Sequence, residues 1–539
     1  MLDEAARAWA ADDPDPTTRA QVEGWLAGGD RAALTEAFRA RLQFGTAGIR
    51  GPIGAGPNRM NHRLGRLVAA GLAAHLGAGA TVVVGRDGRH LSPELADDVA
   101  AVLAGAGLRT LVLPGPVPTP LVAFAVRHLG CSAGVMVTAS HNPPADNGLK
   151  VYAGDGAQIV SPTDVEISAA IDRVTRVRDL PLGVPEHLGT EVLEAYLVAA
   201  AERVPTGPRD VRVVHTAMHG VGTGPVRSLF ARAGLPAPHP VHAQAEPDPD
   251  FPTVAFPNPE EPGALDLALA EAARVDADVV LATDPDADRL AVAVPAGGAW
   301  RALTGDEVGA LLAEQALATT SGPDRLVVSS IVSSTLLGRL AAEAGVEWVT
   351  TLTGFKWIAR AVDDHPGTRF VFGYEEALGY AVHDLVRDKD GITAAAAFAA
   401  LVAQLKANGE TVLDRLDAIM RRHGLHATRQ WSVRLPGAEG VARIAAVVHG
   451  LTDAPPDKLA DRLVVEVTRP ASDVIVLTLE RDARVIVRPS GTEPKLKAYF
   501  QVVIDPVVDV AAARVEAAIA IDALQASLAS LVTDGTMER

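Results

Sequence analysis

Short runs of β-branched residues alternate along the chain with Ala- and Leu-rich stretches whose apolar residues recur at helical spacing. The clearest helix is predicted over residues 92–106, shortly after an apolar run at 82–84. Further strands are predicted at 111–113, 134–138, 211–214, 278–282, 326–332 and 369–372. Strands that alternate with helices in this way favour α/β layers with largely parallel sheets.

The pattern changes after about residue 425, where apolar runs at 463–467, 474–479 and 485–487 follow one another closely. The sequence therefore predicts three consecutive α/β domains with mixed, largely parallel sheets, plus a smaller α+β C-terminal domain. A Pro- and Gly-rich linker at 205–208 and a helix cap at Thr304 mark two of the boundaries. The expected domains are 1–205, 206–305, 306–425 and 426–539.

Composition is that of a soluble globular protein. Of the 539 residues, 48% are hydrophobic and 21% are charged, which is enough apolar material for several cores. The formal net charge of −17 disfavours general binding to nucleic acid or to an anionic membrane, so neither is expected as a partner. A phosphorylated small molecule is still compatible with this charge, provided that basic residues converge locally.

Cysteine use and the N-terminus both favour the cytoplasm. Cys131 is the single cysteine, so an internal disulfide framework is excluded and a reducing compartment is expected. The residues after Met1 lack a basic region followed by an apolar stretch, so we expect no signal peptide. We also expect no membrane span, because no uninterrupted apolar run approaches the ~20 residues that one needs.

Ser140 lies where an apolar run, 135–137, meets a polar segment with two prolines, Pro143 and Pro144. Proline fixes φ, removes a backbone donor and pushes the preceding residue out of the helical region, so a stiff loop is predicted here. The pair 147–148 (NG) predicts a turn, and Lys150 follows it. A serine hydroxyl on a stiff loop with a lysine nearby suggests covalent chemistry, the alternative being an ordinary surface turn.

Three carboxylates follow the predicted strand that ends near residue 282. Asp284, Asp286 and Asp288 occupy alternate positions, which in an extended segment face the same side. Such a set of hard oxygen ligands suits Mg²⁺, with a solvated acidic loop as the alternative. An EF-hand is excluded, because its sixth and twelfth positions would be Arg289 and Pro295 instead of Gly and Glu.

Together with Ser140, this acidic loop resembles the α-D-phosphohexomutase superfamily, the phosphoglucomutases and phosphomannomutases. Five motifs occur in the superfamily's order and span almost the whole chain. They are 44–51 (FGTAGIRG), the phosphoserine loop 138–143 (TASHNP), the metal loop 284–289 (DPDADR), the sugar-recognition loop 373–379 (GYEEALG) and the phosphate-binding loop 488–494 (RPSGTEP).

The resemblance implies a mutase that carries its phosphoryl group on Ser140, with its four domains around one central cleft. Phosphoserine has about −1.5 to −2 charges, so a buried one needs a cation and hydrogen-bond donors. The implied ligands of Mg²⁺ are Asp284, Asp286, Asp288 and one phosphoryl oxygen on Ser140. The metal would draw charge off the phosphoryl group in a loose transition state.

Transfer also requires proton movement at the sugar hydroxyl and at the serine oxygen. The resemblance implies that Arg50 and Lys150 lie near this centre and makes Lys356 a further general acid/base candidate. A lysine acts as a base only if burial or neighbouring cations depress its pKa, and Arg50 is expected to stabilise charge instead. His141 is expected to orient neighbouring groups, with a direct catalytic role as the alternative.

Substrate contacts are expected in two places. Ser490, Gly491 and Thr492 can form an anion nest for the phosphate that is not transferred, and Arg488 adds a planar fork. Glu375 is expected to bridge two sugar hydroxyls. The other implied contacts are Glu376, Arg289, Thr353, Gly354 and Lys497, with Arg86 and Arg89 as supporting charge neutralisers in a further motif at 85–89 (GRDGR).

The implied reaction interconverts a sugar 1-phosphate and 6-phosphate through a sugar 1,6-bisphosphate, which would also act as activator. Many hexose enzymes of the family carry Ser where this chain has Ala377. Ala at this position, and the segments 216–222 and 354–358, resemble the long branch that includes phosphopentomutases and sugar-bisphosphate synthases. Glucose phosphate is expected first, mannose phosphate next and pentose phosphate close behind, in a monomer or homodimer.

Two other functions are compatible with parts of the sequence. One is a metal-dependent phosphatase in which Asp284 is the nucleophile and Ser140 is incidental. The other is a sugar-phosphate sensor that keeps the fold without turnover. His215 and His219 have a metal-like spacing, but they follow a predicted strand and Gly220 ends the run, so loop packing is expected for both.

Overall fold

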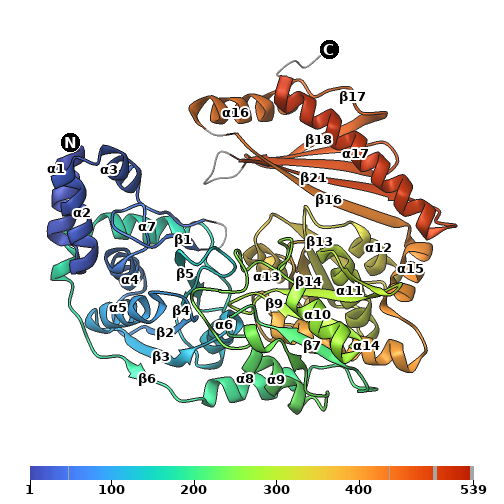
Figure 1. Ribbon diagram of the computed structural model, residues 1–539, viewed down its shortest axis with the longest axis horizontal. Coiled ribbons are helices and arrows are strands. Elements are labelled where there is room, and N and C mark those ends of the chain that lie inside the picture. Colours follow the sequence, from blue (N-terminus) through green and yellow to red (C-terminus); the bar gives the residue numbers. More distant parts are fainter. Residues whose placement is uncertain (46–47, 436, 490–494, 535–539) are drawn as a thin grey trace. The chain divides into compact units, whose positions relative to one another are not determined.

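The computed structural model describes residues 1–45, 48–435, 437–489 and 495–534 (Figure 1). The chain forms two compact units. Unit 1 comprises Met1–Leu303, Gly354–Asp364 and Leu378–Gly409, and unit 2 comprises Thr304–Thr353, His365–Ala377 and Glu410–Arg539.

The first sheet of unit 1 has six strands in the order β1-β5-β4-β2-β3-β6. Its central pairs β2–β4 and β2–β3 are parallel, whereas β5 is antiparallel to both of its neighbours. The strands are β1 (Ile49–Pro52), β2 (Thr81–Arg86), β3 (Arg109–Pro116), β4 (Ala133–Val137), β5 (Asp146–Ala153) and β6 (Glu186–His187). The associated helices are α4 (His62–Leu76), α5 (Ser92–Gly105), α6 (Thr119–His128), α7 (Thr163–Asp172), η1 (Val177–Asp179) and α8 (Glu191–Ala201).

Three N-terminal helices precede this sheet: α1 (Leu2–Asp12), α2 (Pro16–Gly28) and α3 (Arg31–Phe38). Trp9, Val22 and Leu34 are buried in a small apolar cluster of their own. The carboxylate of the buried Asp12 accepts hydrogen bonds from Arg63 and from the backbone N–H of Val177, which ties the helices to the first sheet's layer.

The second sheet of unit 1 has the order β11-β10-β9-β7-β8. β7, β8 and β9 are parallel, and β10 runs antiparallel to β9, so the metal loop is the connection between two adjacent strands. The strands are β7 (Val213–Thr216), β8 (His239–Pro240), β9 (Val279–Thr283), β10 (Leu290–Ala296) and β11 (Ala299–Ala302). The remaining elements are α9 (Thr223–Arg232), η2 (His242–Gln244), α10 (Asp266–Val275), α13 (Phe355–Asp364), β15 (Gly379–Ala381) and α14 (Gly391–Ala407).

Helix α14 is almost wholly buried, which its Ala-rich composition permits. Asp390 caps its N-terminus by accepting hydrogen bonds from the backbone N–H groups of Ile392 and Thr393. Burial raises the pKa of Asp390 to about 6, and the hydroxyl of Tyr196 donates a hydrogen bond to its carboxylate.

Unit 2 begins at a helix cap and contains a parallel sheet in which β12 lies between β13 and β14. Thr304 and Glu307 form the reciprocal capping box of the first helix, which confirms the cap predicted at Thr304. The elements are α11 (Gly305–Thr319), β12 (Arg325–Ser330), α12 (Leu336–Glu343), β13 (Glu347–Thr351), β14 (Arg369–Glu375) and α15 (Val412–His423).

The second sheet of unit 2 is antiparallel, in the order β16-β21-β20-β19-β18-β17. Its strands are β16 (Leu425–Arg434), β17 (Lys458–Leu459), β18 (Arg462–Ala471), β19 (Val474–Leu479), β20 (Ala483–Pro489) and β21 (Lys495–Ile504). Helices α16 (Gly437–Asp453) and α17 (Val510–Asp534) lie along this sheet in Figure 1. The apolar cluster at Val332, Ile486 and Tyr499 joins it to the β12 region.

Helix α17 is long and apolar enough to cross a membrane by length and composition, and among the described residues it alone passes that test. Its residues Ile521, Leu524, Leu528 and Val532 are nevertheless buried in the core of the antiparallel sheet. One face of α17 therefore packs against the antiparallel sheet of this domain.

The structure confirms the fold class of three α/β domains followed by a C-terminal domain that combines helices with a sheet. The turn predicted at Asn147 and Gly148 is wrong. Both residues lie in β5, where Gly148 pairs with Arg50 of β1. A Cβ on Gly148 would lie 2.4 Å from the carbonyl oxygen of Ile49 and 2.7 Å from that of Thr138. The glycine is needed for close strand approach, which mimics a turn signal in the sequence.

Gly148→Ala is therefore expected to destabilise the protein by ~1–3 kcal/mol, because both nearby carbonyls belong to the backbone and cannot move independently. Gly224→Ala is the matched control, since a Cβ at Gly224 in α9 meets nothing within 4 Å. Urea denaturation should show a lower midpoint for the first variant only. Equal midpoints for the two variants would contradict this account of Gly148.

Candidate active site

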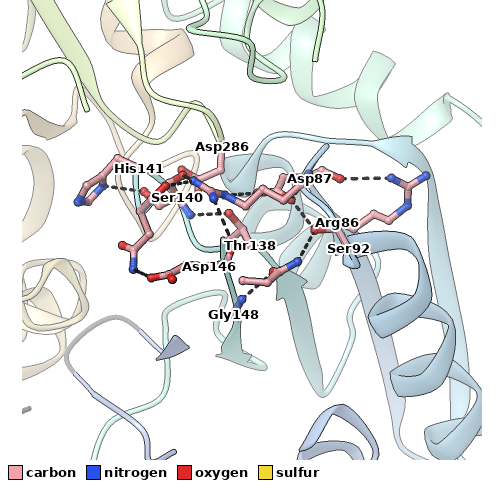
Figure 2. Close-up of polar contacts among 12 residues, drawn as sticks. Arg86, Asp87, Ser92, Thr138, Ser140, His141, Asp146, Gly148 and Asp286 are labelled. Atoms are coloured by element: carbon pink, nitrogen blue, oxygen red, sulfur yellow. Dashed lines mark hydrogen bonds and ion pairs between the residues drawn. The ribbon is translucent and has the colours of Figure 1, made fainter. Parts of the chain in front are cut away.

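Ser140 lies immediately after β4, in a left-handed backbone conformation with φ of 53°. Its backbone N–H donates to the Thr138 hydroxyl (2.8 Å), a contact drawn in Figure 2. The Ser140 hydroxyl donates to Oδ2 of Asp284 at 2.7 Å. Ser140 is only 1% exposed, so its hydroxyl faces the acidic loop and not solvent.

The carboxylates of Asp284, Asp286 and Asp288 converge, with one ligand oxygen from each lying within 4.8 Å of the others. The loop is not extended as predicted. Ala287 has a φ of 56° and its N–H donates to the Asp284 carbonyl (2.9 Å), so a tight turn brings the three together. Within the part of the chain that the structure describes, Oδ1 of Asp286 and Oδ1 of Asp288 are buried without a hydrogen-bond partner. Orphaned buried carboxylate oxygens fit a divalent cation.

Two ammonium groups balance part of this buried negative charge. Lys150 Nζ donates to Oδ2 of Asp286 (2.7 Å) and of Asp288 (2.6 Å). Lys389 Nζ lies 3.1 Å from Oδ2 of Asp288. Burial acts to raise the pKa of Asp288, but Lys150 and Lys389 together hold that pKa below its usual value.

Asp286 differs from Asp288. Burial raises its pKa, and the negative charge of Asp288 raises it further. Thr119, at the start of α6, donates its hydroxyl to Oδ2 of Asp286 (2.6 Å), and its backbone N–H donates to the Asp286 carbonyl (2.9 Å). Neither Thr119 nor Lys389 was predicted. Both lie more than 100 positions from Asp288 in the printed sequence, so neither local pattern nor spacing indicates them.

His141 and Arg50 also lie at this centre. The Ser140 hydroxyl lies 3.0 Å from Nδ1 of His141. Burial, together with the cations of Arg289 and Arg50, holds the pKa of His141 well below its ordinary value, so the imidazole is neutral at pH 7. Arg50 Nη1 donates to the side-chain oxygen of Asn142 at 3.5 Å.

Arg89, one of the two predicted supporting arginines, directly holds residues 138–146, which we call the serine loop. Arg89 is 2% exposed. Its guanidinium donates to four backbone carbonyls of that loop, those of Ser140 (2.5 Å), Asn142 (2.5 Å), Pro143 (2.8 Å) and Asp146 (3.2 Å). Arg86, at the end of β2, donates to the carbonyl of Asp87 (3.2 Å). Figure 2 shows Arg86 turned away from Ser140.

Lys356 and Gly354 stand at the start of α13. Gly354 has φ of 109°, which turns the chain into the helix. Lys356 lines a pocket with Gly45, Gly48 and Asp164, and its ammonium lies 5.9 Å from the centre of the Trp357 ring. Burial lowers the pKa of Lys356. This pocket adjoins the motif at residues 44–51 and does not include Ser140 among the described residues that line it.

The predicted sugar loop, in unit 2, follows β14 directly. Oε2 of Glu376 accepts hydrogen bonds from the hydroxyls of Ser330 (3.0 Å) and Ser333 (3.2 Å). The start of α11 abuts this loop, because a Cβ on Gly305 would lie 1.8 Å from the Glu376 carbonyl oxygen. Burial, followed by the charges of Glu375 and Asp306, raises the pKa of Glu376 to about 7. Glu375 is half-buried at the adjacent position.

Arg488 and Lys497 are opposite each other on β20 and β21. The guanidinium of Arg488 donates to the hydroxyl of Thr353, so these two predicted phosphate contacts are neighbours. Ser490, Gly491 and Thr492 lie outside the described residues. Arg289 lies beside the metal loop, where its N–H donates to Oδ1 of Asp284 (3.0 Å) and its guanidinium lies 3.5 Å from Glu260.

Asp306 is a buried carboxylate of unit 2 that the sequence analysis missed. It accepts hydrogen bonds from the N–H of Ser334 (2.7 Å), the hydroxyl of Tyr374 (2.8 Å) and the hydroxyl of Thr428 (2.5 Å). These donors come from the turn after β12, from β14 and from β16. A single carboxylate therefore links the antiparallel sheet to the strand that ends at Glu375.

His215 and His219 are both buried but have separate partners. His215 Nε2 lies 3.4 Å from the Thr283 hydroxyl, and burial lowers its pKa to about 4. His219 Nε2 lies 2.8 Å from the Thr253 hydroxyl.

Profiles of the phosphoglucomutase/phosphomannomutase family match this chain in four consecutive parts. Its α/β/α domains I, II and III match residues 41–178, 194–297 and 304–423, and its C-terminal domain matches residues 433–520.

Curated relatives extend the comparison. A Haemophilus influenzae protein named "Probable phosphomannomutase" is 43% identical over 82% of this chain and 92% of its own length. The phosphopentomutase of Mus musculus is 35% identical over 94% of this chain and 91% of its own. A phosphoglucomutase of Staphylococcus epidermidis is 35% identical over 87% and 92%, respectively.

A crystal structure of a candidate phosphomannomutase from Thermus thermophilus superposes with a TM-score of 0.70. It is 28% identical and covers 90% of this chain and 99% of its own. The chain therefore belongs to the phosphoglucomutase/phosphomannomutase family. It is accordingly a phosphosugar mutase, an isomerase, with an acidic triad that could bind a metal ion.

The raised pKa of Glu376 predicts a pH-dependent stability difference. Between pH ~4.5 and ~7 the folded chain keeps a proton that the unfolded chain has lost, so the free energy of unfolding falls as pH rises through this window. Glu376→Gln removes that group, and urea unfolding should show the variant gaining stability relative to wild type across the window. Glu466→Gln, at an exposed position of β18, is the control. Parallel pH profiles for wild type and Glu376→Gln would contradict the raised pKa.

Proposed function

We propose that the protein interconverts glucose 1-phosphate and glucose 6-phosphate, with mannose phosphates as the next substrates, by way of a phosphoserine at Ser140 and a glucose 1,6-bisphosphate intermediate. The observation that carries this proposal is the buried hydrogen bond from the Ser140 hydroxyl to Asp284 at 2.7 Å, within a converged carboxylate triad. An incidental surface serine would not be aimed at such a cluster.

The metal that the site suits is Mg²⁺, held by Asp284, Asp286 and Asp288. When bound, it would neutralise charge on the phosphoryl group and on the serine oxygen. Support comes from the two buried oxygens of Asp286 and Asp288 that lack a partner among the described residues. Glucose 1,6-bisphosphate would prime a dephosphorylated Ser140.

The residues around Ser140 would have separate roles in phosphoryl transfer. In the first half-reaction the sugar hydroxyl oxygen forms a bond to phosphorus as the bond from phosphorus to Ser140 Oγ breaks. The sugar hydroxyl loses its proton in this step, and Lys356, whose pKa burial lowers, would be the base that takes it. A neutral imidazole 3.0 Å from Ser140 Oγ would let His141 take up the proton of the serine hydroxyl when Ser140 is phosphorylated, and the imidazolium so formed would return that proton when Oγ leaves phosphorus. Lys150 donates to two carboxylates, so we assign it to charge balance in this arrangement. Arg50 would stabilise the phosphoryl oxygens.

Substrate binding is assigned to the residues of unit 2. Arg488, Thr353 and Lys497, with Ser490 to Thr492, would hold the phosphate that is not being transferred. Glu375 and Glu376 would accept hydrogen bonds from sugar hydroxyls. A carboxylate that accepts from two adjacent hydroxyls orients the ring in either of two flipped poses, which a mutase requires.

The alternative is a phosphopentomutase that interconverts ribose or deoxyribose 1- and 5-phosphate, or a sugar-bisphosphate synthase. Ala377 favours it, because the loop lacks the hydroxyl that many hexose enzymes carry. The mouse phosphopentomutase also aligns over 94% of this chain.

We place the activity in the cytoplasm, consistent with the single Cys131. Burial raises the pKa of the Cys131 thiol to about 11. Domain boundaries near residues 205, 305 and 425 are also proposed.

A coupled assay with Mg²⁺ and a trace of glucose 1,6-bisphosphate should decide the substrate. Glucose 1-phosphate, mannose 1-phosphate and ribose 1-phosphate are compared at the same enzyme concentration. We expect the highest kcat/KM for glucose 1-phosphate. A clearly higher kcat/KM for ribose 1-phosphate would support the phosphopentomutase alternative and contradict the hexose assignment.

Mg²⁺ should raise the melting temperature of the wild-type protein, because it binds only the folded triad. At one hundred times its Kd a ligand contributes about 2.7 kcal/mol. Asp286→Asn should lose most of this gain, and Asp97→Asn, at an exposed position of α5, should keep it. If the Asp286 variant responds to Mg²⁺ as the control does, the metal is bound elsewhere.

A further inference from the structure

The serine loop and the metal loop meet through reacting groups whose contacts must change during the proposed reaction. Once Ser140 carries a phosphoryl group, its Oγ is an ester oxygen and has no proton to donate. The 2.7 Å hydrogen bond to Asp284 is then lost. Lys150 and Thr119 join the metal loop to the serine-bearing sheet, but among the described residues neither side chain is hydrogen-bonded to the backbone of the serine loop itself. That loop therefore needs a further connection to the metal loop, outside the reacting groups, if their spacing is to stay constant between half-reactions.

We propose that residues 247–254, which we call the strap, are that connection, and that Phe251 is a positioning residue for phosphoryl transfer. This inference rests on the proposed phosphoserine chemistry. The strap belongs to the segment between η2 and α10, and all its contacts considered below lie within unit 1.

On one side, the strap covers the segment that carries Arg89. The guanidinium carbon of Arg89 lies 4.9 Å from the centre of the Phe251 ring, a cation–π contact between two residues that are 2% and 3% exposed. A Cβ on Gly88 would lie 2.8 Å from Pro247, and His90 lies 2.7 Å from Asp250. Arg89 donates hydrogen bonds to four carbonyls of the serine loop. A shift of Phe251 would therefore move Arg89, and Ser140 with it.

On the other side, the strap holds the turn after β7. The rings of His219 and Phe251 meet edge to face, with centroids 6.5 Å apart. His219 Nε2 also lies 2.8 Å from the Thr253 hydroxyl, and the Asp248 N–H donates to the His219 carbonyl (3.0 Å). Met218 and His219 are both left-handed, with φ of 50° and 59°, a conformation that persists only when the surroundings enforce it.

The turn after β7 also contacts the metal loop. The Val221 N–H donates to the Pro285 carbonyl at 2.9 Å, between Asp284 and Asp286. A Cβ on Gly220 would lie 2.3 Å from the Pro285 carbonyl oxygen. Phe251 thus touches Arg89 and His219 at once, and through them the backbones of both loops. Neither contact involves a group that gains or loses phosphate.

The test compares Phe251→Leu, which keeps apolar volume but removes the π face, with Phe251→Tyr, which keeps the face. We measure kcat, KM and melting temperature. We also measure the rate at which Ser140 takes a phosphoryl group from glucose 1,6-bisphosphate, using intact-protein mass spectrometry of quenched samples. We expect Phe251→Leu to lower kcat and this rate about ten-fold or more at unchanged KM, since small misplacements of reacting groups are costly. Phe251→Tyr should restore most of both.

Wild-type kcat in Phe251→Leu, or an equal loss in Phe251→Tyr, would overturn the inference. If Phe251→Leu fails to fold, Thr253→Val and its control Thr253→Ser replace the pair, and equal kcat for these two would overturn it. Wild-type protein that takes up no phosphate at Ser140 would instead contradict the proposed function on which the inference rests. Normal uptake by wild type and by Phe251→Leu would overturn the strap alone.

Discussion

Three buried carboxylates on one tight turn are the constraint on which the active centre depends. Charge of this density is tolerated inside a protein only when it is paired. The chain supplies Lys150 from β5 and Lys389 from the segment just before α14, and Thr119 adds a hydroxyl from α6. Each partner comes from a different segment, so the charge balance links the serine-bearing sheet to the sheet that carries the metal loop. The oxygens that these groups do not satisfy fit a divalent cation.

The backbone around these groups needs unusual conformations and close approaches between main chains. Ser140, Ala287, Met218 and His219 all adopt left-handed conformations, and several glycines allow main chains to touch where a side chain would not fit. Strain at such positions is sustained by the packing around it. Arg89 has this function for the serine loop, and the turn after β7 has it for the metal loop. In unit 2, Asp306 has a corresponding role, because its hydrogen bonds tie the predicted sugar loop to the antiparallel sheet.

Much of this could be predicted from sequence, because local pattern determines strands, caps and short motifs. The α/β alternation, the Thr304 cap, Ser140 and the three aspartates are of this kind. Lys389, Thr119, Asp306 and Phe251 could not be found, since their significance arises only from contacts across long sequence separations. Asn147 and Gly148 were misread as a turn, because glycine required for close strand approach has the same local signature. The hydrogen bonds of Arg89 to four backbone carbonyls could likewise not be predicted from a motif that suggests charge neutralisation.

The central claim is that the phosphoryl group is carried on Ser140. Its most direct test is to incubate wild-type and Ser140→Ala protein separately with glucose 1,6-bisphosphate that is isotopically labelled in its phosphoryl groups, quench with acid, and map the label by peptide mass spectrometry. The account predicts label on Ser140 in the wild type and none in the variant. Label on Asp284, retained in Ser140→Ala, would contradict it and identify an aspartyl-phosphate enzyme instead.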